Sequence, residues 1–440
     1  MEQFNNLIEF RQATYKHGLT KAGDAQFELI DALLLGRPIR SFPELSLLPI
    51  FRRQWHSSYA AIERGGQDQQ WLERHFIRQI PTQGLKLFSL DGTAWPHPAA
   101  RALADRQYVF SPTAAVDGGS IVIGHPYSVL AWVPQPGSSW GLPVSVKRVL
   151  SQQTDVEVGI EQVKRLCRHR HEEMLEHLHL VIADAKYGNH RFLGPLKDEP
   201  CGALVRMRRD RVLYGAPGPY SGRGRPRVHG ERFAFKEPET WGEPDAMIEL
   251  EHPRWGKVRL RRWDDKHARQ DADTWFSVVL VEAHLERQKP SAPFWLGYQP
   301  PPHQKAADQL LESLWHWYEY RWPVEPSIRF RKQYLNWTLP RFQAPECCDR
   351  WTTLVSLAQW QLFLGRDLVE DSPLPWQPPQ EDPTPERVLQ GFGGLFREIG
   401  TPAAPPQTRG KSPGWPKGRP RTRPERHRVV KKGKKKPKPA

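Results

Sequence analysis

Three acidic residues occupy positions from which carboxylates could hold metal ions. Asp91 follows an apolar stretch in LKLFSLDGT, Asp184 follows another in HLHLVIADAKYGN, and Glu325 lies in YEYRWPVEPSIRFRKQ. Carboxylates at neighbouring strand ends and on a nearby helix can bind two hard cations through oxygen. Two such ions stabilise both the attacking and the leaving oxygen in phosphodiester cleavage. An aspartate before a glycine is also common turn chemistry, so a purely structural role for Asp91 stays open.

Basic and phenolic side chains accompany the glutamate. Tyr318, Arg321, Glu325 and Lys332 are separated by three, four and seven residues, which on an ideal helix places them within roughly 60° of one another. Such cations and hydroxyls can donate to phosphate oxygens. A helix accepts proline only in its first turn, so we expect the helix to begin near Pro323 with Glu325 in that turn. The alternative is a solvated charged face.

Residues 85–208 change from helical periodicity to short apolar runs that alternate with helical segments. This order predicts an α/β core with a mixed sheet flanked by helices. The expected strands are 85–91, 106–116, 121–133, 177–184 and 202–208, and the expected helices are 155–177 and 189–197. The first and fourth of these strands would each end in one of the two aspartates, which would bring both to the same edge of the core.

The rest of the chain divides by composition. Residues 1–84 are predicted to be helical and could form a DNA-reading module or a plain packing layer. Residues 209–303 read as a β-rich insertion, and 304–370 as the second part of the core with the glutamate helix. Residues 371–440 form a Pro-rich linker and a basic tail, with a short amphipathic helix after Pro385 that would dock on the core or on a partner.

The charge excess is concentrated at the C-terminal end. The chain has a formal net charge of +15, and residues 411–440 hold thirteen Lys or Arg against one acid, Glu425. Low hydrophobicity with high charge predicts a disordered tail, and such a tail attracts phosphate backbones without reading sequence. Lys431, Lys434 and Lys435 are candidate DNA contacts there. A solvated tail without a ligand is the alternative.

A second basic segment lies inside the predicted insertion. GRGRPR at 222–227 carries Arg223 and Arg225 in a Gly/Pro-rich setting. Arginines on such a flexible arm can enter a narrow A·T minor groove, which makes both residues candidate DNA contacts. The alternative is a flexible loop without a ligand.

Composition also excludes several classes of protein. Four cysteines without a C-x-x-C pair argue against a disulfide-built fold and against a zinc ribbon. The His-rich segment 169–179 lacks H-E-x-x-H, which favours a solvated helix over a metal site. No apolar run approaches the ~18 residues of a membrane helix. The first ten residues, MEQFNNLIEF, do not predict a signal peptide.

At these residues the sequence resembles a DDE-type transposase with an RNase H-like core. The branch that it resembles consists of cut-and-paste insertion-sequence enzymes with the signature Y-(2)-R-(3)-E-(6)-K. Tyr318, Arg321, Glu325 and Lys332 match that spacing at every position. LDGT at 90–93 and IADAKYGN at 182–189 resemble the contexts of the two aspartates of that family.

The resemblance implies a catalytic triad of Asp91, Asp184 and Glu325 that binds two Mg²⁺ ions, with Mn²⁺ as a substitute. It implies hydrolysis of a phosphodiester at the end of the element and attack of the freed 3′ hydroxyl on target DNA. Tyr318, Arg321 and Lys332 would contact phosphates near the cut. The implied partners are terminal inverted repeats, target DNA and a second copy of the chain, in the cytoplasm at a bacterial nucleoid and not at a membrane.

Other functions on the same residues stay open. A non-catalytic DNA-binding derivative would bind DNA without cutting it. A stand-alone nuclease would cut without joining ends. A structural RNA- or nucleoid-associated protein would owe nearly all its affinity to the basic tail.

Overall fold

The structure of the protein, a computed structural model, describes residues 2–111, 120–135, 137–170, 177–220, 222, 224–253, 255–284, 292–302, 304–305, 308–371, 373, 375–407, 414, 416–418, 420 and 423–432. The helices are α1 (Glu2–Ala13), α2 (Gly23–Leu34), α3 (Trp55–Glu63), α4 (Gln69–Ile77), α5 (Asp155–His169), α6 (His190–Leu193), α7 (Leu311–Glu319), α8 (Val324–Gln333), α9 (Pro345–Leu364), α10 (Pro385–Phe392) and α11 (Phe396–Ile399). The strands are β1 (Lys86–Pro96), β2 (Gln107–Phe110), β3 (Ile121–Trp132), β4 (Leu142–Arg148), β5 (His179–Gly188), β6 (Gly202–Met207), β7 (Val212–Tyr214), β8 (Arg232–Ala234), β9 (Ala246–His252), β10 (Gly256–Ala268), β11 (Asp271–His284) and β12 (Phe294–Gln299).

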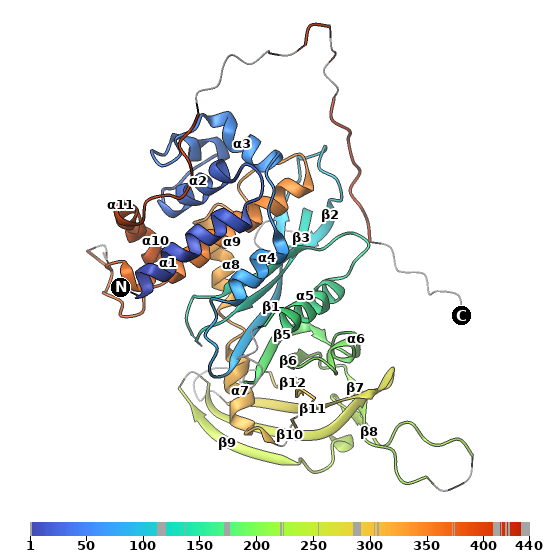
Figure 1. Cartoon of the computed structure of the whole chain (residues 1–440). Coiled ribbons are helices and arrows are strands. Elements are labelled where there is room, and N and C mark those ends of the chain that lie inside the picture. Colours follow the sequence, from blue (N-terminus) through green and yellow to red (C-terminus); the bar gives the residue numbers. More distant parts are fainter. Residues whose placement is uncertain are drawn as a thin grey trace.

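One sheet runs through the molecule (Figure 1). Its strand order is β2-β3-β1-β5-β6-β12-β11-β10-β7-β8, with β4 paired to β3 and β9 paired to β10. β5 lies parallel to both β1 and β6, whereas β3 lies antiparallel to β1 and β4. The segment β4-β3-β1-β5-β6 is consistent with the expected RNase H-like core.

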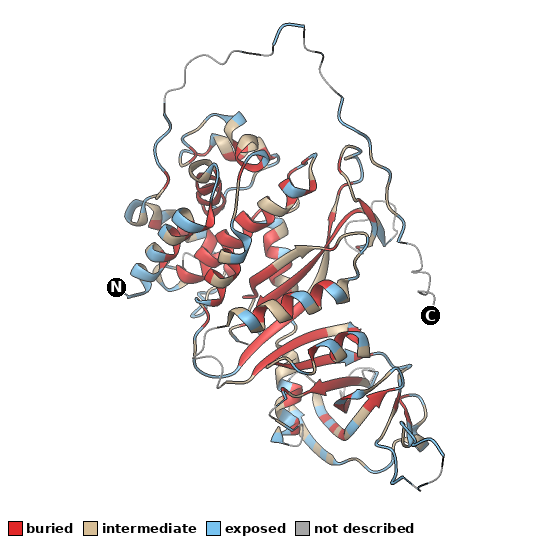
Figure 2. Cartoon of the chain, turned by 45° about the vertical axis from the view of Figure 1, so that its right-hand side comes forward, coloured by how far each residue is buried: buried red, intermediate tan, exposed pale blue. Residues whose placement is uncertain are grey.

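The core strands are buried on both faces. In Figure 2 they are mostly red, the colour of buried residues. Successive side chains of a strand point to opposite faces. Leu90 lies on the α5 face, because the position of a β-carbon on Gly159 would be 2.8 Å from the Leu90 side chain. Ser89 lies on the other face, where its hydroxyl donates to the backbone oxygen of Arg321. The sheet is therefore covered by α5 on one side and by the α7–α8 segment on the other.

Helix α5 begins as the sequence indicates. Thr154 accepts from the backbone N–H of Glu157, and the Glu157 carboxylate accepts from the Thr154 N–H, which completes a capping box. The helix ends at His169, earlier than the predicted 177, and residues 171–176 lie outside the described residues. The predicted strands 106–116 and 121–133 correspond to β2 and β3, which pair antiparallel, and residues 112–119 between them also lie outside the described residues.

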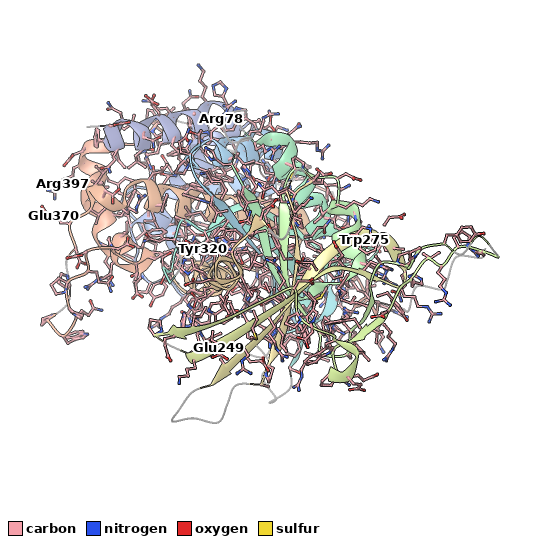
Figure 3. The ribbon with its side chains drawn as sticks, turned by 90° about the horizontal axis from the view of Figure 1, so that it is seen from below. Arg78, Glu249, Trp275, Tyr320, Glu370 and Arg397 are labelled. Atoms are coloured by element: carbon pink, nitrogen blue, oxygen red, sulfur yellow. The ribbon has the colours of Figure 1, made fainter. Side chains whose placement is uncertain are left out.

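The β-rich insertion extends the core sheet instead of forming a sheet of its own. β12 pairs antiparallel with β6, and β11, β10 and β9 continue outward. Helix α7 packs Leu314 and Trp315 against this part of the sheet. Seen from below, Glu249 lies on β9 at the outer edge, where it pairs with Arg259 at 2.7 Å (Figure 3). The insertion thus supports the helix that leads into the glutamate segment.

The N-terminal helices form a layer over α9, the long buried helix that packs on β4. α2 is buried from Gln26 to Leu34, and its Asp31 pairs with Arg11 of α1 at 2.9 Å inside the layer. A helix enclosed in this way cannot enter a DNA groove, which favours the packing interpretation for α2. DNA binding by the other parts of residues 1–84 stays a prediction.

The predicted helix after Thr384 is present as α10 and docks on α9, with Val388 and Phe392 fully buried. Further along, the expectation of a disordered tail is wrong for residues 423–432. The backbone N–H of His427 donates to the Arg101 oxygen at 2.9 Å, and that of Val430 donates to the Arg106 oxygen at 2.7 Å. This segment runs along the edge of the sheet beside Gln107, because backbone hydrogen bonds offset the ordering of a polar chain.

Three strands differ from the prediction, namely β1, β4 and β5. β4 was not predicted, because its sequence LPVSVKR contains a proline and small polar residues. Asp91 and Asp184 do not end their strands: β1 continues to Pro96 and β5 to Gly188. Among the described residues, no helix is both long and apolar enough to cross a membrane.

Candidate active site

The two aspartates are neighbours by strand register. β1 and β5 pair in parallel from Lys86–His179 to Leu90–Ala183, and the pairing stops there. The next position of this register is Asp91 opposite Asp184. Each carboxylate accepts one local backbone hydrogen bond through Oδ1, from Gly92 at 2.7 Å and from Lys186 at 2.9 Å. These bonds orient the two carboxylates at the point where the strands separate.

Glu325 comes to the same place on helix α8. The helix begins after Pro323 with Glu325 in its first turn, as the sequence predicts. Ser327 fixes this turn, since its hydroxyl donates to the Gly141 oxygen at 2.5 Å and accepts from the Gln359 amide of α9 at 2.8 Å. The helical turn that carries the glutamate is thus anchored through Ser327 to Gly141 and to α9.

Strand alternation places the aspartate on the glutamate side of the sheet. Asp91 shares a face with Ser89, whose hydroxyl lies 3.3 Å from the Arg321 backbone oxygen. Arg321 lies in the turn between α7 and α8, four residues before the glutamate. The α7–α8 turn therefore packs directly against the strand that carries Asp91.

Negative charge accumulates at Asp91. Burial, together with the charges of Asp184 and Glu325, raises the pKa of the Asp91 carboxyl to about 6, while the Gly92 N–H and the Arg321 guanidinium oppose the shift. Like charges that remain close in the folded protein disfavour ionisation of each other. The site therefore gains from a cation, which would remove the repulsion.

One cation already pairs with the glutamate. Arg321 Nη1 lies 2.7 Å from Glu325 Oε1, and both side chains are partly exposed. Tyr318 stands beside this pair and packs its ring near Phe294 of β12, with centroids 6.1 Å apart. Burial raises the pKa of the Tyr318 phenol against the opposing effect of Arg321, so the hydroxyl stays a hydrogen-bond donor.

Lys332 lies on the same helix but contacts a different part of the strand. Its Nζ donates to the Ala94 oxygen at 2.9 Å, three residues beyond Asp91. Burial lowers the pKa of Lys332 to about 8, and Arg331 adds to the effect. The structure thus brings the ammonium to the strand of the first aspartate, within the same part of the molecule as Tyr318 and Arg321.

The donor set suits Mg²⁺ better than softer metals, because every candidate ligand is a carboxylate oxygen. The three acids do not converge on one point: within the described residues, three metal-donor atoms come within 4.8 Å of one another only at His97, His125 and Cys348. The divided arrangement, with two aspartates on adjacent strands and a glutamate on the covering helix, fits two ions better than one. The unneutralised charge at Asp91 supports the same fit.

Sequence reasoning missed a charged pair beside the site. Lys186 Nζ lies 3.6 Å from Asp155 Oδ1 at the start of α5. A β-carbon on Gly92 would lie 3.1 Å from this Nζ, so the ammonium covers the residue after Asp91 on the α5 face. The only signal in the sequence is Lys186 two residues after Asp184.

The remaining candidate DNA contacts are apart from the acids. Arg225 is exposed in the loop between β7 and β8, which projects from the end of the insertion (Figure 1). Lys431 is exposed on the docked tail segment. Arg223, Lys434 and Lys435 lie outside the described residues.

Comparison with known proteins agrees with this geometry. The family model described as DDE superfamily endonuclease matches residues 14–270, more than half of the chain, and includes both aspartates. The match ends before Glu325, so the glutamate is supported by its position in the structure. No curated protein matches the chain. Nucleases of this family act on DNA with divalent metal ions. The chain belongs to the DDE superfamily of endonucleases.

Proposed function

We propose that this protein is a DNA transposase that cuts at the ends of an insertion sequence and joins them to target DNA. The observation that carries the proposal is the register of β1 and β5, which sets Asp91 opposite Asp184 where the strands separate. Glu325 in the first turn of α8 supplies the third carboxylate on the same side of the sheet.

In this proposal Asp91, Asp184 and Glu325 hold two Mg²⁺ ions through their carboxylate oxygens. When bound, these ions stabilise the charge on the attacking and the leaving oxygen of the phosphodiester. The protein contributes orientation: the Gly92 and Lys186 N–H groups fix the two aspartates, and Ser327 fixes the glutamate turn. Preorganised ligands of this kind need no rearrangement during the reaction.

Arg321 has two partners in succession. In the protein alone its guanidinium neutralises Glu325. If Glu325 held a cation instead, the guanidinium would be available for a DNA phosphate, for which its planar fork is suited. Tyr318 and Lys332 would add donors on either side. This use of the four signature residues supports the insertion-sequence branch with Y-(2)-R-(3)-E-(6)-K.

The basic segments would hold the DNA around the cut. Lys432 Nζ donates to the Gln153 oxygen at 2.9 Å, next to the residue that caps α5. Because α5 begins with Asp155 near Lys186 and Gly92, the docked tail leads toward the acid site. Lys431 and the lysines that follow it would contact duplex backbone there, and Arg225 would contact it at the far end of the insertion. We expect two copies of the chain on paired terminal repeats.

The test is a Mg²⁺-dependent cleavage and strand-transfer assay on DNA that contains the ends flanking the gene. The wild type is compared with Asp91→Ala, Asp184→Ala and Glu325→Ala, and with Glu161→Ala as a control for an exposed acid on α5. The proposal expects the wild type and the control to cut and join, and each triad variant to bind DNA without doing either.

The other outcomes separate the alternatives. Cutting without joining would identify a stand-alone nuclease on this fold. Equal DNA binding by all five proteins without cutting would identify a non-catalytic derivative. Cleavage by the triad variants at the wild-type rate would refute the assignment of the three acids.

A further inference from the structure

A second group of metal-donor side chains lies in the core, apart from the acids. His97 directly follows β1, His125 is on β3, and Cys348 is on α9. Their side chains offer three donor atoms within 4.8 Å of one another, and no residue of the group is more than 4% exposed. Nothing in the family match or in the proposed transposase chemistry uses them.

The hydrogen bonds of the group leave one strong acceptor unsatisfied. His125 Nε2 donates to the Ala104 backbone oxygen at 2.9 Å, so the lone pair of its neutral ring is on Nδ1. This Nδ1 is fully buried and has no hydrogen-bond partner. An unsatisfied buried acceptor destabilises the folded state, and a metal ion bound at Nδ1 would remove that cost.

The ring orientation is the one found around bound metal. A histidine that ligates a metal through one nitrogen usually donates its other N–H to a carboxylate or a backbone carbonyl, which fixes the tautomer. His125 already makes this hydrogen bond to the Ala104 backbone oxygen in the protein alone. Its ring meets that of His97 edge to face, with centroids 5.2 Å apart.

The distances are close to those that zinc requires. His97 Nε2 and Cys348 Sγ lie 3.9 Å apart. Ligands of tetrahedral zinc at Zn–N of about 2.0 Å and Zn–S of about 2.3 Å are separated by roughly 3.5 Å. Closure of this pair around an ion therefore needs a shift of a few tenths of an ångström, and the other two donor–donor distances are within 4.8 Å. Two imidazoles and a thiolate suit zinc and exclude Mg²⁺, which prefers oxygen.

We propose that His97, His125 and Cys348 bind one Zn²⁺ ion that ties the end of β1 to β3 and α9. The two imidazoles bind as neutral ligands, and Cys348 binds as thiolate, so each ion that enters releases one proton from the thiol. With three protein ligands, the fourth tetrahedral position takes a water molecule. The ion would hold the strand of Asp91 from its far end.

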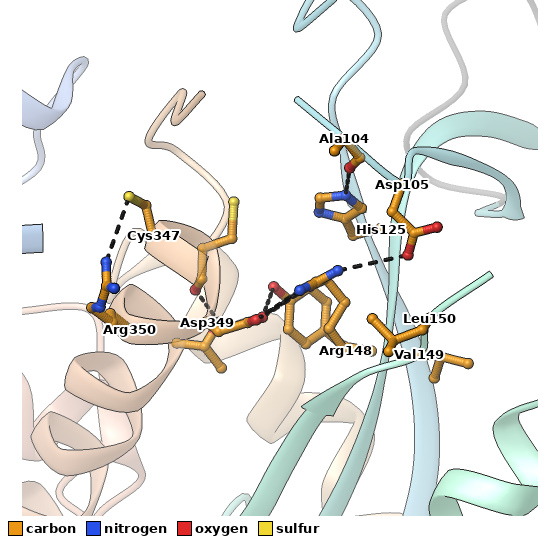
Figure 4. A network of polar contacts seen from close by, with 12 residues as sticks. Ala104, Asp105, His125, Arg148, Val149, Leu150, Cys347, Asp349 and Arg350 are labelled. Carbon is orange, nitrogen blue, oxygen red and sulfur yellow. Dashed lines mark hydrogen bonds and ion pairs between the residues drawn. The ribbon is translucent and has the colours of Figure 1, made fainter. Parts of the chain in front are cut away.

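A simple hydrogen bond between Cys348 and His97 explains less. It would satisfy those two residues and would leave His125 Nδ1 without a partner. The neighbouring polar groups are already engaged: Arg148 bridges Asp105 and Asp349, and Cys347 faces Arg350 (Figure 4). Cys347 therefore serves as a matched control for Cys348.

The test is the metal content of the full-length protein, purified without chelators and measured by inductively coupled plasma mass spectrometry. We expect about one zinc per chain in the wild type, in Cys347→Ala and in Asp91→Ala. In Cys348→Ala and in His125→Ala the zinc content per chain should be at least tenfold lower, because the two remaining ligands bind zinc weakly. Circular dichroism verifies that each variant is folded.

A second measurement does not depend on any variant. Cobalt added to the metal-free wild type should give the visible bands of a tetrahedral ion and a thiolate charge-transfer band in the near ultraviolet, and zinc should displace both. Absence of zinc and of these bands in the folded wild type would overturn the proposal, as would equal zinc content in Cys348→Ala. Neither readout requires DNA cleavage, so failure of the zinc site and failure of the transposase assignment are distinguishable.

Discussion

The acid site and the His97–His125–Cys348 cluster are joined by strand β1. They differ in donor type, burial and charge, the properties that determine which metal binds. The acid site offers only oxygen donors, is partly open and accumulates negative charge at Asp91. The cluster offers nitrogen and sulfur donors, is buried and carries no charged carboxylate among its three donors. Strand β1 connects them, since Asp91 lies within it and His97 directly follows it.

The difference teaches how one sheet can support a reactive site and a structural site. Partly exposed hard oxygens leave room for substrate phosphates and for ions that exchange. Buried soft donors leave an ion no route to substrate, so its contribution is to hold elements together. Ligand type and burial, not sequence distance, separate the two roles, and each role predicts a different response to mutation.

The largest effect is expected from Asp184→Asn. The change keeps the shape of the side chain and its backbone contact but removes one negative charge from the proposed ion site. Cleavage should fall on the order of 10³-fold, because ions contribute several kcal/mol to such transition states and each ~1.4 kcal/mol is a factor of ten. The measurement is Mg²⁺-dependent cleavage of labelled DNA, with Glu161→Gln as the control. Unchanged zinc content in Asp184→Asn would show that the acid site and the zinc cluster are independent, whereas loss of zinc would show that they are coupled.

Removal of zinc by a chelator should have a smaller effect, on thermal stability and not on cleavage. A zinc chelator such as 1,10-phenanthroline should lower the Tm of the wild type by about 5 °C, since an ion that binds only the folded state stabilises it. Cys348→Ala should melt lower from the start and should not respond to the chelator. The measurement is differential scanning calorimetry without Mg²⁺. Equal responses of Cys348→Ala and Cys347→Ala would contradict the assignment of the ligand.

Asp91→Asn should stabilise the protein in the absence of Mg²⁺. The folded state raises the pKa of Asp91 from 3.8 to about 6, so its charge disfavours folding at any pH above that range. At about 1.4 kcal/mol per unit the gain on neutralisation is up to about 3 kcal/mol at pH 7. The gain shrinks as the pH falls through 6 and is absent below 3.8, where the wild-type carboxyl is protonated in both states.

Urea denaturation of wild type and Asp91→Asn at several pH values checks this expectation. Mg²⁺ should stabilise the wild type and leave Asp91→Asn unaffected, which ties the stability cost of the charge to its use in binding ions. The expectation would be contradicted if Asp91→Asn were less stable than the wild type at pH 7, or if it gained the same free energy of unfolding at pH 3.5 and at pH 7. Either result would show that the Asp91 charge does not destabilise the folded state.

The acid site was predictable because each acid follows a local pattern. The apolar runs before Asp91 and Asp184 indicate strands, and Pro323 indicates the first turn of the glutamate helix. The exact ends of the strands were not predictable, since β1 and β5 continue beyond the point where their parallel pairing stops. Pairing depends on neighbouring strands, which a local pattern does not contain.

The buried cluster had no such signal. His97, His125 and Cys348 are separated by 28 and 223 residues, so no ligand spacing links them. Only the packing of β1, β3 and α9 brings them together. The docked tail was missed for a related reason, because its attachment uses backbone hydrogen bonds of His427 and Val430 that are independent of side-chain type.

The smallest expected effect concerns the tail, which contacts the surroundings of both sites. Its backbone binds the loop between His97 and Gln107, and Lys432 reaches the residue before the α5 cap. If this docking positions the tail for DNA, the double change Lys431→Ala, Lys432→Ala should reduce the salt slope of DNA binding by about 1.8 and slow cleavage about fivefold, through loss of about 1 kcal/mol at the transition state.

The matched control is Lys417→Ala, Arg423→Ala, which removes the same charge from exposed tail positions before the docked hydrogen bonds. It should reduce the salt slope equally, since counterion release counts charges without regard to position. Cleavage by this control should stay at the wild-type rate, because its cations are not held beside α5. Salt-dependent binding and cleavage by the two variants distinguish two roles of the tail. Equal losses of cleavage would show that the tail only attracts DNA through its charge, whereas a loss confined to the first variant would make residues 427–432 an extension of the acid site.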